Sequence, residues 1–295
     1  MRKKTALILL SLPWLYSLFF LFFRQEPDWY SYHMAFNEHW YSSVIRGDIT
    51  DNVMPPGFIW FGMPLHSIRL SPVIALRLVS LIAFTFLFCV IYKIYGEKKA
   101  ILLASLPYIA LWSSRAQTDM LFCALAFGGL FISMNNKSKQ FLAGIVSGIS
   151  TFVKPPGVLV GLGKWNIRYW LGIIIGMIPF LVWLYFHKES IAFHAGDSKP
   201  FGDAIRIVWA LIVGLGISWL LIDLKSINWS YKIMIIVYLL FALFKAPIGH
   251  EYYLLPVYIA SIMLYNTENK KYWFVVGVNS LMSLGLLILL NNWKP

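Results

Sequence analysis

The chain has 295 residues, of which 59% are hydrophobic and 13% are charged, with a formal net charge of +12. Soluble domains carry about 25% charged residues, so this composition and a mean hydropathy of +0.68 exclude an ordinary soluble fold and predict a polytopic membrane protein. Lys and Arg flank the apolar segments and form no basic domain, so the charge indicates positive-inside topology and contact with anionic lipid, not nucleic-acid binding.

Apolar segments close to the roughly 20-residue length of a membrane span recur along the whole chain. The first follows a basic N-terminus without a small-residue cleavage site, so we expect an uncleaved span and not a signal peptide. The sequence predicts an all-α transmembrane helix bundle of about 11 spans, namely 6–23, 72–94, 100–113, 118–134, 140–153, 155–163, 169–186, 205–222, 232–244, 253–265 and 272–290.

The loops sort into two sets when the N-terminus is placed in the cytoplasm. The inner loops are short and each carries at least two Lys or Arg; they are Lys93–Lys99, Asn135–Gln140, Lys164–Arg168, Asp223–Lys232 and Asn266–Tyr272. All histidines and all acids except Glu97, Asp223 and Glu268 then fall on the outer side. Chemistry is therefore expected at the non-cytoplasmic face of a cell membrane. Nucleotide-dependent chemistry is disfavoured, and no glycine-rich phosphate loop is present.

The longest predicted outer segment is 24–71, and it is rich in aromatic residues. Its pattern predicts two interfacial helices, one over 30–45 and one that begins at Pro55-Pro56 and runs to about His66. The remaining spans occupy 72–291. We expect one module over 1–295 without a soluble C-terminal domain.

Asp28 follows the first span directly, where charge near hydrocarbon is costly and usually serves a function. A carboxylate there can act as a general base toward an acceptor hydroxyl, or it can cap the 30–45 helix. Glu26 is the second candidate catalytic acid. Three other roles stay open for it: binding a cation, binding acceptor hydroxyls, or simple exposure to solvent.

Three further charged residues border predicted outer turns. Arg115 can bind a phosphate. Asp119 begins a span, where a negative charge also suits the helix N-terminus. Lys154 precedes Pro155-Pro156, so it either has a fixed role at a re-entry point or extends toward the interface.

A last polar cluster lies between two late spans. Lys245 and His250 are expected to hold an anionic leaving group, beside Glu251 and Tyr252. The histidines at 187 and 194 form no recognisable zinc spacing, so no metal site is assigned. The thiols Cys89 and Cys123 lie inside predicted spans and are expected to be buried and apolar.

These segments, in this order, resemble the GT-C superfamily of membrane glycosyltransferases, in the branch of protein O-mannosyltransferases and lipid A aminoarabinose transferases. Glu26-Pro27-Asp28 resembles the acidic motif of the first outer loop. The other matching segments are Pro55 to Ile59, Arg77 to Ser80, Arg115 to Leu121, Thr151 to Gly157 and Gly249 to Pro256. Two positions depart from the family pattern: Trp29 stands where the family often has Glu, and Met54 where it has His or Lys.

The resemblance implies a polyprenyl-phosphate-linked sugar donor, an outer acceptor, which is a lipid, glycan or protein, and inversion at the anomeric carbon. Asp28 would be the base, and Arg115, Lys154, Lys245 and His250 would hold the donor phosphate. Contacts to sugar or acceptor are assigned to Asp119, Glu251, Tyr252, Trp29 and His33. No cofactor is assigned, and a divalent cation stays open.

Two alternatives remain from the sequence. An outer-face glycan polymerase or ligase also has many spans, but it usually has a large late outer loop. A lipid-linked sugar transporter or flippase would need polar groups and broken helices near the membrane centre, often in repeated halves, and the sequence shows no internal repeat.

Overall fold

The computed structural model describes residues 8, 14–15, 55–70, 72–186, 204–223, 228–245 and 251–292. Within these ranges the chain is helical, and the one β-type contact is an isolated bridge between Ile222 and Tyr265. The longer helices are α3 (Gly57–Ser67), α4 (Pro72–Tyr95), α5 (Glu97–Ser105), α6 (Pro107–Ser113), α7 (Thr118–Asn135), α8 (Gln140–Val153), α9 (Ile167–Gly176), α10 (Ile178–Phe186), α12 (Ala204–Leu215), α13 (Trp229–Lys245), α14 (Leu255–Ser261) and α15 (Tyr272–Asn292). Short 3-10 helices join them: η2 (Lys137–Lys139), η3 (Pro155–Gly163), η4 (Ser218–Leu221), η5 (Glu251–Leu254) and η6 (Ile262–Leu264).

The all-α class is confirmed, and the apolar helices fit a membrane protein. Among the described residues, α4 and α7 are long and apolar enough to cross a membrane, and α9 with α10 forms a third candidate bent by 41°. This is fewer than the sequence predicts. The predicted first span, 6–23, and the predicted helix over 30–45 lie outside the described residues.

Two predicted spans are interrupted at a proline or a glycine. Pro107 lacks a backbone N–H and forces Leu106 into an extended conformation at ψ 128°, so the predicted span 100–113 divides into α5 and α6. The predicted span 205–222 ends as α12 at Leu215, because Gly216 adopts a positive φ of 55° and the chain continues as η4. The predicted span 155–163 is the nine-residue 3-10 helix η3.

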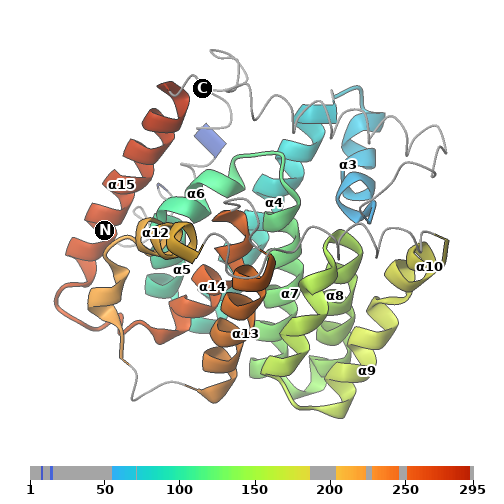
Figure 1. Ribbon diagram of the computed structural model, residues 1–295. Helices are drawn as coiled ribbons and strands as arrows, with labels where there is room; N and C mark the ends of the chain where they lie inside the picture. The colour runs from blue at the N-terminus through green and yellow to red at the C-terminus, as the bar shows by residue number, and fades with distance from the viewer. Residues whose placement is uncertain are drawn as a thin grey trace.

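Helix α7 packs between α4 and α8 (Figure 1). Ser80 near the start of α4 meets Gln117 just before α7, and Tyr95 at the end of α4 meets Asn135 at the end of α7, so these two helices are parallel. The turn at η2 reverses the chain, and the Ser147 hydroxyl of α8 donates to the Ala126 carbonyl of α7. Helix α8 is therefore antiparallel to α7.

Helices α8 and α9 pack in close parallel contact through glycine. A Cβ added to Gly144 would lie 3.0 Å from the Gly172 Cα, and one added to Gly148 would lie 2.8 Å from the Gly176 Cα. Each helix thus carries a Gly-xxx-Gly pair at the contact, the pattern by which membrane helices bring their backbones together. Because the two helices are parallel, η3 and residues 164–166 must return along the bundle between them.

The described parts of the five predicted inner loops lie together at one end of the bundle, and residues 224–227 lie outside the described residues. Tyr95 hydrogen-bonds with Tyr231 and Asn135. Lys98 forms a 2.7 Å ion pair with Glu268, and Asp223 N–H donates to the Leu264 carbonyl. The loop at Lys164 follows Gly163, whose neighbour is Met234 of α13. The described positive residues of these loops therefore share one end, which we call the basic end.

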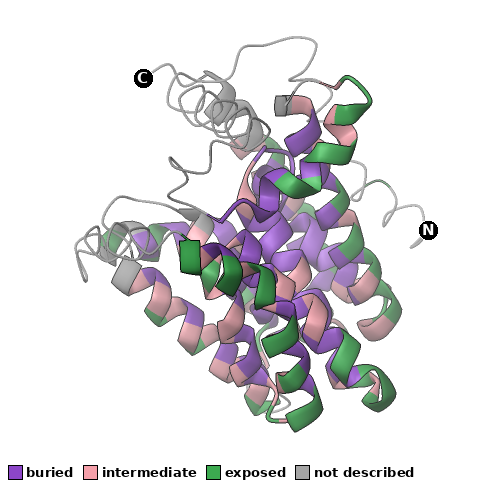
Figure 2. Cartoon of the chain, turned by 90° about the vertical axis from the view of Figure 1, so that its right-hand side faces the viewer, coloured by how far each residue is buried: buried purple, intermediate pink, exposed green. Residues whose placement is uncertain are grey.

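Burial follows the bundle arrangement. Figure 2 shows buried residues along the middle of the bundle and exposed residues on its outer surface. Large apolar side chains such as Leu171, Ile174 and Leu181 on α9 and α10 are about half exposed, as lipid-facing residues would be. Cys123 is buried as predicted, whereas the prediction for Cys89 is wrong: it is exposed on the outer face of α4.

Candidate functional site

The end of the bundle opposite the basic end collects several of the segments that the sequence singled out. Five segments meet there in pairs. They are the start of α3, the start of α4, the turn before α7, the end of α8 and η5. These segments contain Pro55 to Ile59, Arg77 to Ser80, Arg115 to Leu121, Thr151 to Gly157 and the described part of Gly249 to Pro256. We call it the site end.

Helix α3 is the predicted second helix of the 24–71 segment, and its predicted bounds are confirmed within a residue. It begins after Pro56, where proline suits the first turn. A Cβ on Gly57 would lie 2.4 Å from the Phe152 carbonyl oxygen, and Trp60 packs edge-to-face on Phe152 at 5.1 Å between ring centroids. Only glycine at position 57 allows so close an approach. Gly57 thus lets α3 pack against the turn that carries Lys154.

The centre of the site end is an ion pair between Lys154 and Asp119. Lys154 Nζ lies 2.5 Å from an Asp119 carboxylate oxygen, and the Asp119 side chain is 2% exposed. Asp119 lies in the first turn of α7 but does not cap it, since the N-cap position is Gln117. The lysine points inward to this carboxylate, so the interpretation of Lys154 as extending toward the interface is wrong. Removing one partner of a buried pair typically costs about 3–5 kcal/mol.

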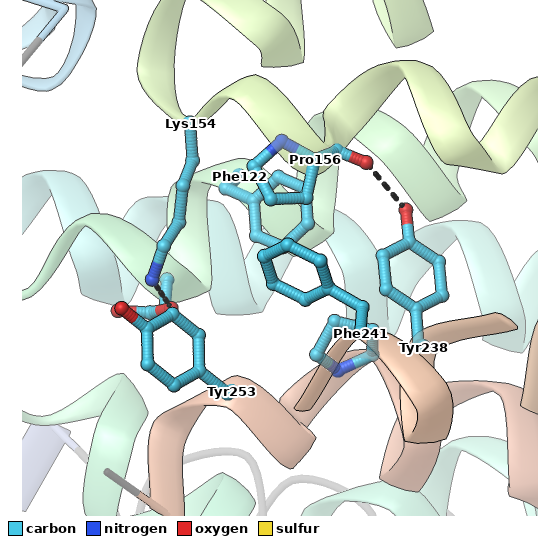
Figure 3. Close-up of a pocket in the computed structure, with 8 residues that line it drawn as sticks. Phe122, Lys154, Pro156, Tyr238, Phe241 and Tyr253 are labelled. Carbon is cyan, nitrogen blue, oxygen red and sulfur yellow. Dashed lines mark hydrogen bonds and ion pairs between the residues drawn. The ribbon is translucent and has the colours of Figure 1, made fainter. Parts of the chain in front are cut away.

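Tyr253 of η5 completes the surroundings of the lysine (Figure 3). The Lys154 ammonium lies 4.4 Å from the centroid of the Tyr253 ring, within the range of a cation–π contact. Beside them, Tyr238 of α13 donates its hydroxyl to the Pro156 carbonyl at 3.1 Å. This bond satisfies a backbone acceptor in the turn and joins α13 to it.

The pair borders a narrow aromatic pocket. It is lined by Asp119, Phe122, Lys154, Pro156, Tyr238, Phe241, Tyr253 and Pro256, as Figure 3 shows for its labelled members. The space between these side chains does not admit a water molecule. A ligand that reaches Asp119 must therefore displace some of the lining side chains.

Arg115 lies in the turn between α6 and α7, four residues before Asp119. The residue is 5% exposed, and its guanidinium carbon lies 5.2 Å from the centroid of the Trp112 ring. Ser80 ties this turn to α4 through a 3.1 Å hydrogen bond from its hydroxyl to the Gln117 carbonyl. The turn that carries Arg115 is thus held to α4 through Ser80 and to α6 through Trp112.

The other predicted site residues fall in less defined places. Lys245 is the last residue of α13, and Glu251 and Tyr252 open η5. Asp28, Glu26, Trp29, His33 and His250 lie outside the described residues. Within the described residues no group of three or more His, Cys, Asp or Glu is placed to hold a metal ion.

Sequence reasoning missed two tyrosines of the site. Tyr253 follows Glu251 and Tyr252, which were selected, and it is Tyr253 in η5 whose ring contacts Lys154. Tyr238 is fully buried in α13. A lone tyrosine within an apolar span, with a hydroxyl that needs a partner, was the signal available in the sequence.

This arrangement offers an ammonium for an anion, a carboxylate for hydroxyl groups or a cation, and aromatic faces beside both. Comparison with known proteins adds nothing to it: no family model, no curated protein and no solved structure matches the chain.

Proposed function

We propose that the protein is an integral-membrane glycosyltransferase of the GT-C type. It moves a sugar from a polyprenyl-phosphate donor to an acceptor hydroxyl on the non-cytoplasmic side, with inversion. The observation that carries the proposal is that segments selected from sequence for this activity, though far apart in the chain, meet at the site end around Asp119 and Lys154.

Further features of the structure support the proposal. The basic end is the end expected in the cytoplasm by the positive-inside rule, so the site end would face the opposite side. Exposed apolar faces, such as that of α9 and α10, would leave the donor's prenyl chain in lipid beside the bundle. The aromatic pocket would surround the sugar.

In the reaction, the acceptor oxygen attacks the anomeric carbon while Asp28 takes the hydroxyl proton. A new bond forms between the anomeric carbon and the acceptor oxygen, the bond to the donor phosphate oxygen breaks, and polyprenyl phosphate leaves with both electrons. Lys154 and Arg115 stabilise the negative charge that develops on that phosphate. General-base help of this kind is worth about 10²–10⁴-fold in rate.

The test is sugar transfer by the full chain in lipid from a panel of polyprenyl-monophosphate sugars, with a cell lipid extract as acceptor source. Wild type should consume one donor, and Asp28→Asn should lower the rate by at least about 100-fold. Glu268→Gln is the matched control, because it removes an exposed carboxylate at the basic end and should leave the rate unchanged.

Absence of transfer from every donor, with wild type folded and extract present, would reject the proposal. Equal losses in Asp28→Asn and Glu268→Gln would reject the role of Asp28 alone.

A transporter or flippase of lipid-linked sugars is the second candidate, because the structure contains the broken helices that such proteins use. Both breaks meet α15: Asn279 accepts from the Ile217 N–H and donates to Ser218, and Ser283 donates to the Ser105 carbonyl. These polar groups satisfy one another, which favours a structural role. Translocation of a fluorescent lipid-linked sugar across sealed vesicles, without sugar release, would favour the transporter.

A further inference from the structure

We propose that the Asp119–Lys154 pair is an internal lock on the site, and that the phosphate of an isoprenyl monophosphate opens it by replacing Asp119 at the Lys154 ammonium. The ligand class rests on the proposed function, but the lock itself rests on the geometry of the pair. Asp119 is then a positioning residue that competes with the ligand for Lys154.

Burial sets the order of events. The Lys154 side chain is 15% exposed, whereas that of Asp119 is 2% exposed. An incoming anion therefore contacts the Lys154 ammonium before any ligand group can contact the Asp119 carboxylate. Lysine suits the exchange, because its ammonium is a point charge on a flexible four-carbon chain that can move between partners.

The narrowness of the pocket gives a second reason. The pair and the Tyr253 ring border a space that does not admit a water molecule. Asp119 therefore has no solvent to replace the lysine while the pair is intact. Moving Lys154 toward a phosphate opens this space and leaves Asp119 facing it, where sugar hydroxyl groups can donate to the carboxylate.

The lock predicts that its two partners affect phosphate binding in opposite directions. Binding is measured as the Kd of farnesyl monophosphate for the full chain in lipid nanodiscs, with farnesol and inorganic phosphate as separate ligands. Asp119→Asn, which removes the competitor, should tighten binding of farnesyl monophosphate about tenfold, within the usual range of coupling between sites. Lys154→Met should abolish the preference for farnesyl monophosphate over farnesol.

Each single variant leaves one charge of the buried pair without its partner, which destabilises the fold. A double variant therefore serves as the control for folding. Asp119→Asn with Lys154→Met contains no orphan charge and should bind farnesyl monophosphate no better than farnesol. Glu268→Gln disrupts the exposed pair with Lys98 at the basic end and should leave every Kd unchanged.

Three results would overturn the lock: unchanged or weaker binding in Asp119→Asn, no preference for the phosphate in wild type and Asp119→Asn, or retained preference in the double variant. Inorganic phosphate that binds as tightly as farnesyl monophosphate would overturn the assignment to an isoprenyl ligand. None of these readouts uses sugar transfer, so the lock and the glycosyltransferase proposal fail separately.

Discussion

Lys99 shows how a single residue holds the basic end together. Its ammonium donates to the carbonyls of Ile262 (2.7 Å) and Tyr265 (2.5 Å), and it therefore joins the start of α5 to the end of η6. Burial lowers the pKa of Lys99 from its ordinary value of 10.5 to about 8. The charged form is thus less favourable in the folded protein than in the unfolded chain.

The sign of the resulting pH dependence follows from proton binding. Between about pH 8 and pH 10.5 the unfolded chain holds the Lys99 proton more strongly than the folded protein does. Stability attributable to Lys99 should therefore rise with pH across this window. The measurement is the thermal unfolding midpoint between pH 7 and pH 10.5 for wild type and Lys99→Met.

Other titrating groups are common to both proteins, so the difference between their pH slopes isolates Lys99. Wild type should gain stability relative to Lys99→Met as the pH rises. Parallel slopes would show that the Lys99 proton is not linked to folding.

At this scale the sequence identified charged residues but not their partners. Lys154 before two prolines and Asp119 were selected separately, and the structure pairs them. Their pairing across 35 residues depends on how α7 and α8 pack, which local spacing does not encode. The Tyr253 contact depends in the same way on the 3-10 turn of η5.

The parallel contact of α8 and α9 is the most demanding packing between elements. A Cβ on Gly148 would lie 2.3 Å from the Ile173 carbonyl oxygen, and backbone cannot move aside as a flexible side chain can. Gly148→Ala should therefore destabilise the protein by about 1–3 kcal/mol, the usual cost of overpacking. The measurement is reversible unfolding in mixed detergent.

Gly277 of α15 provides the matched control, because a Cβ there would meet no atom within 4 Å. Gly277→Ala should be neutral or stabilise the protein by up to about 1 kcal/mol through helix propensity. Equal effects of the two substitutions would contradict the close contact between α8 and α9.

Continuous apolar helices were predictable, and their interruptions were not. Helices α4 and α7 agree closely with the predicted spans 72–94 and 118–134. Hydropathy does not register that Pro107 and Gly216 divide apolar runs, or that α15 supplies Asn279 and Ser283 to the freed backbone groups. The interruptions depend on a helix that follows much later in the chain.

For the whole molecule, the sorting of loops by charge is the prediction on which the function depends. The contacts of Tyr95, Lys98 and Asp223 bring the described parts of four of the five predicted inner loops to one end of the bundle. Hydropathy and loop charge were enough to predict this grouping, because a chain that crosses the membrane repeatedly places successive loops at alternate ends of the bundle. The side of the membrane that each end faces is a separate claim.

Cysteine accessibility in intact cells tests that claim most directly. Ser67 at the end of α3 and Ser138 in η2 are both exposed, and serine-to-cysteine substitution changes little in size. In a background with Cys89 and Cys123 replaced by alanine, a membrane-impermeant maleimide should label Ser67→Cys in intact cells. Ser138→Cys should be labelled only after the membrane is opened. Labelling of Ser138→Cys alone in intact cells, or of both, would contradict a site on the non-cytoplasmic face.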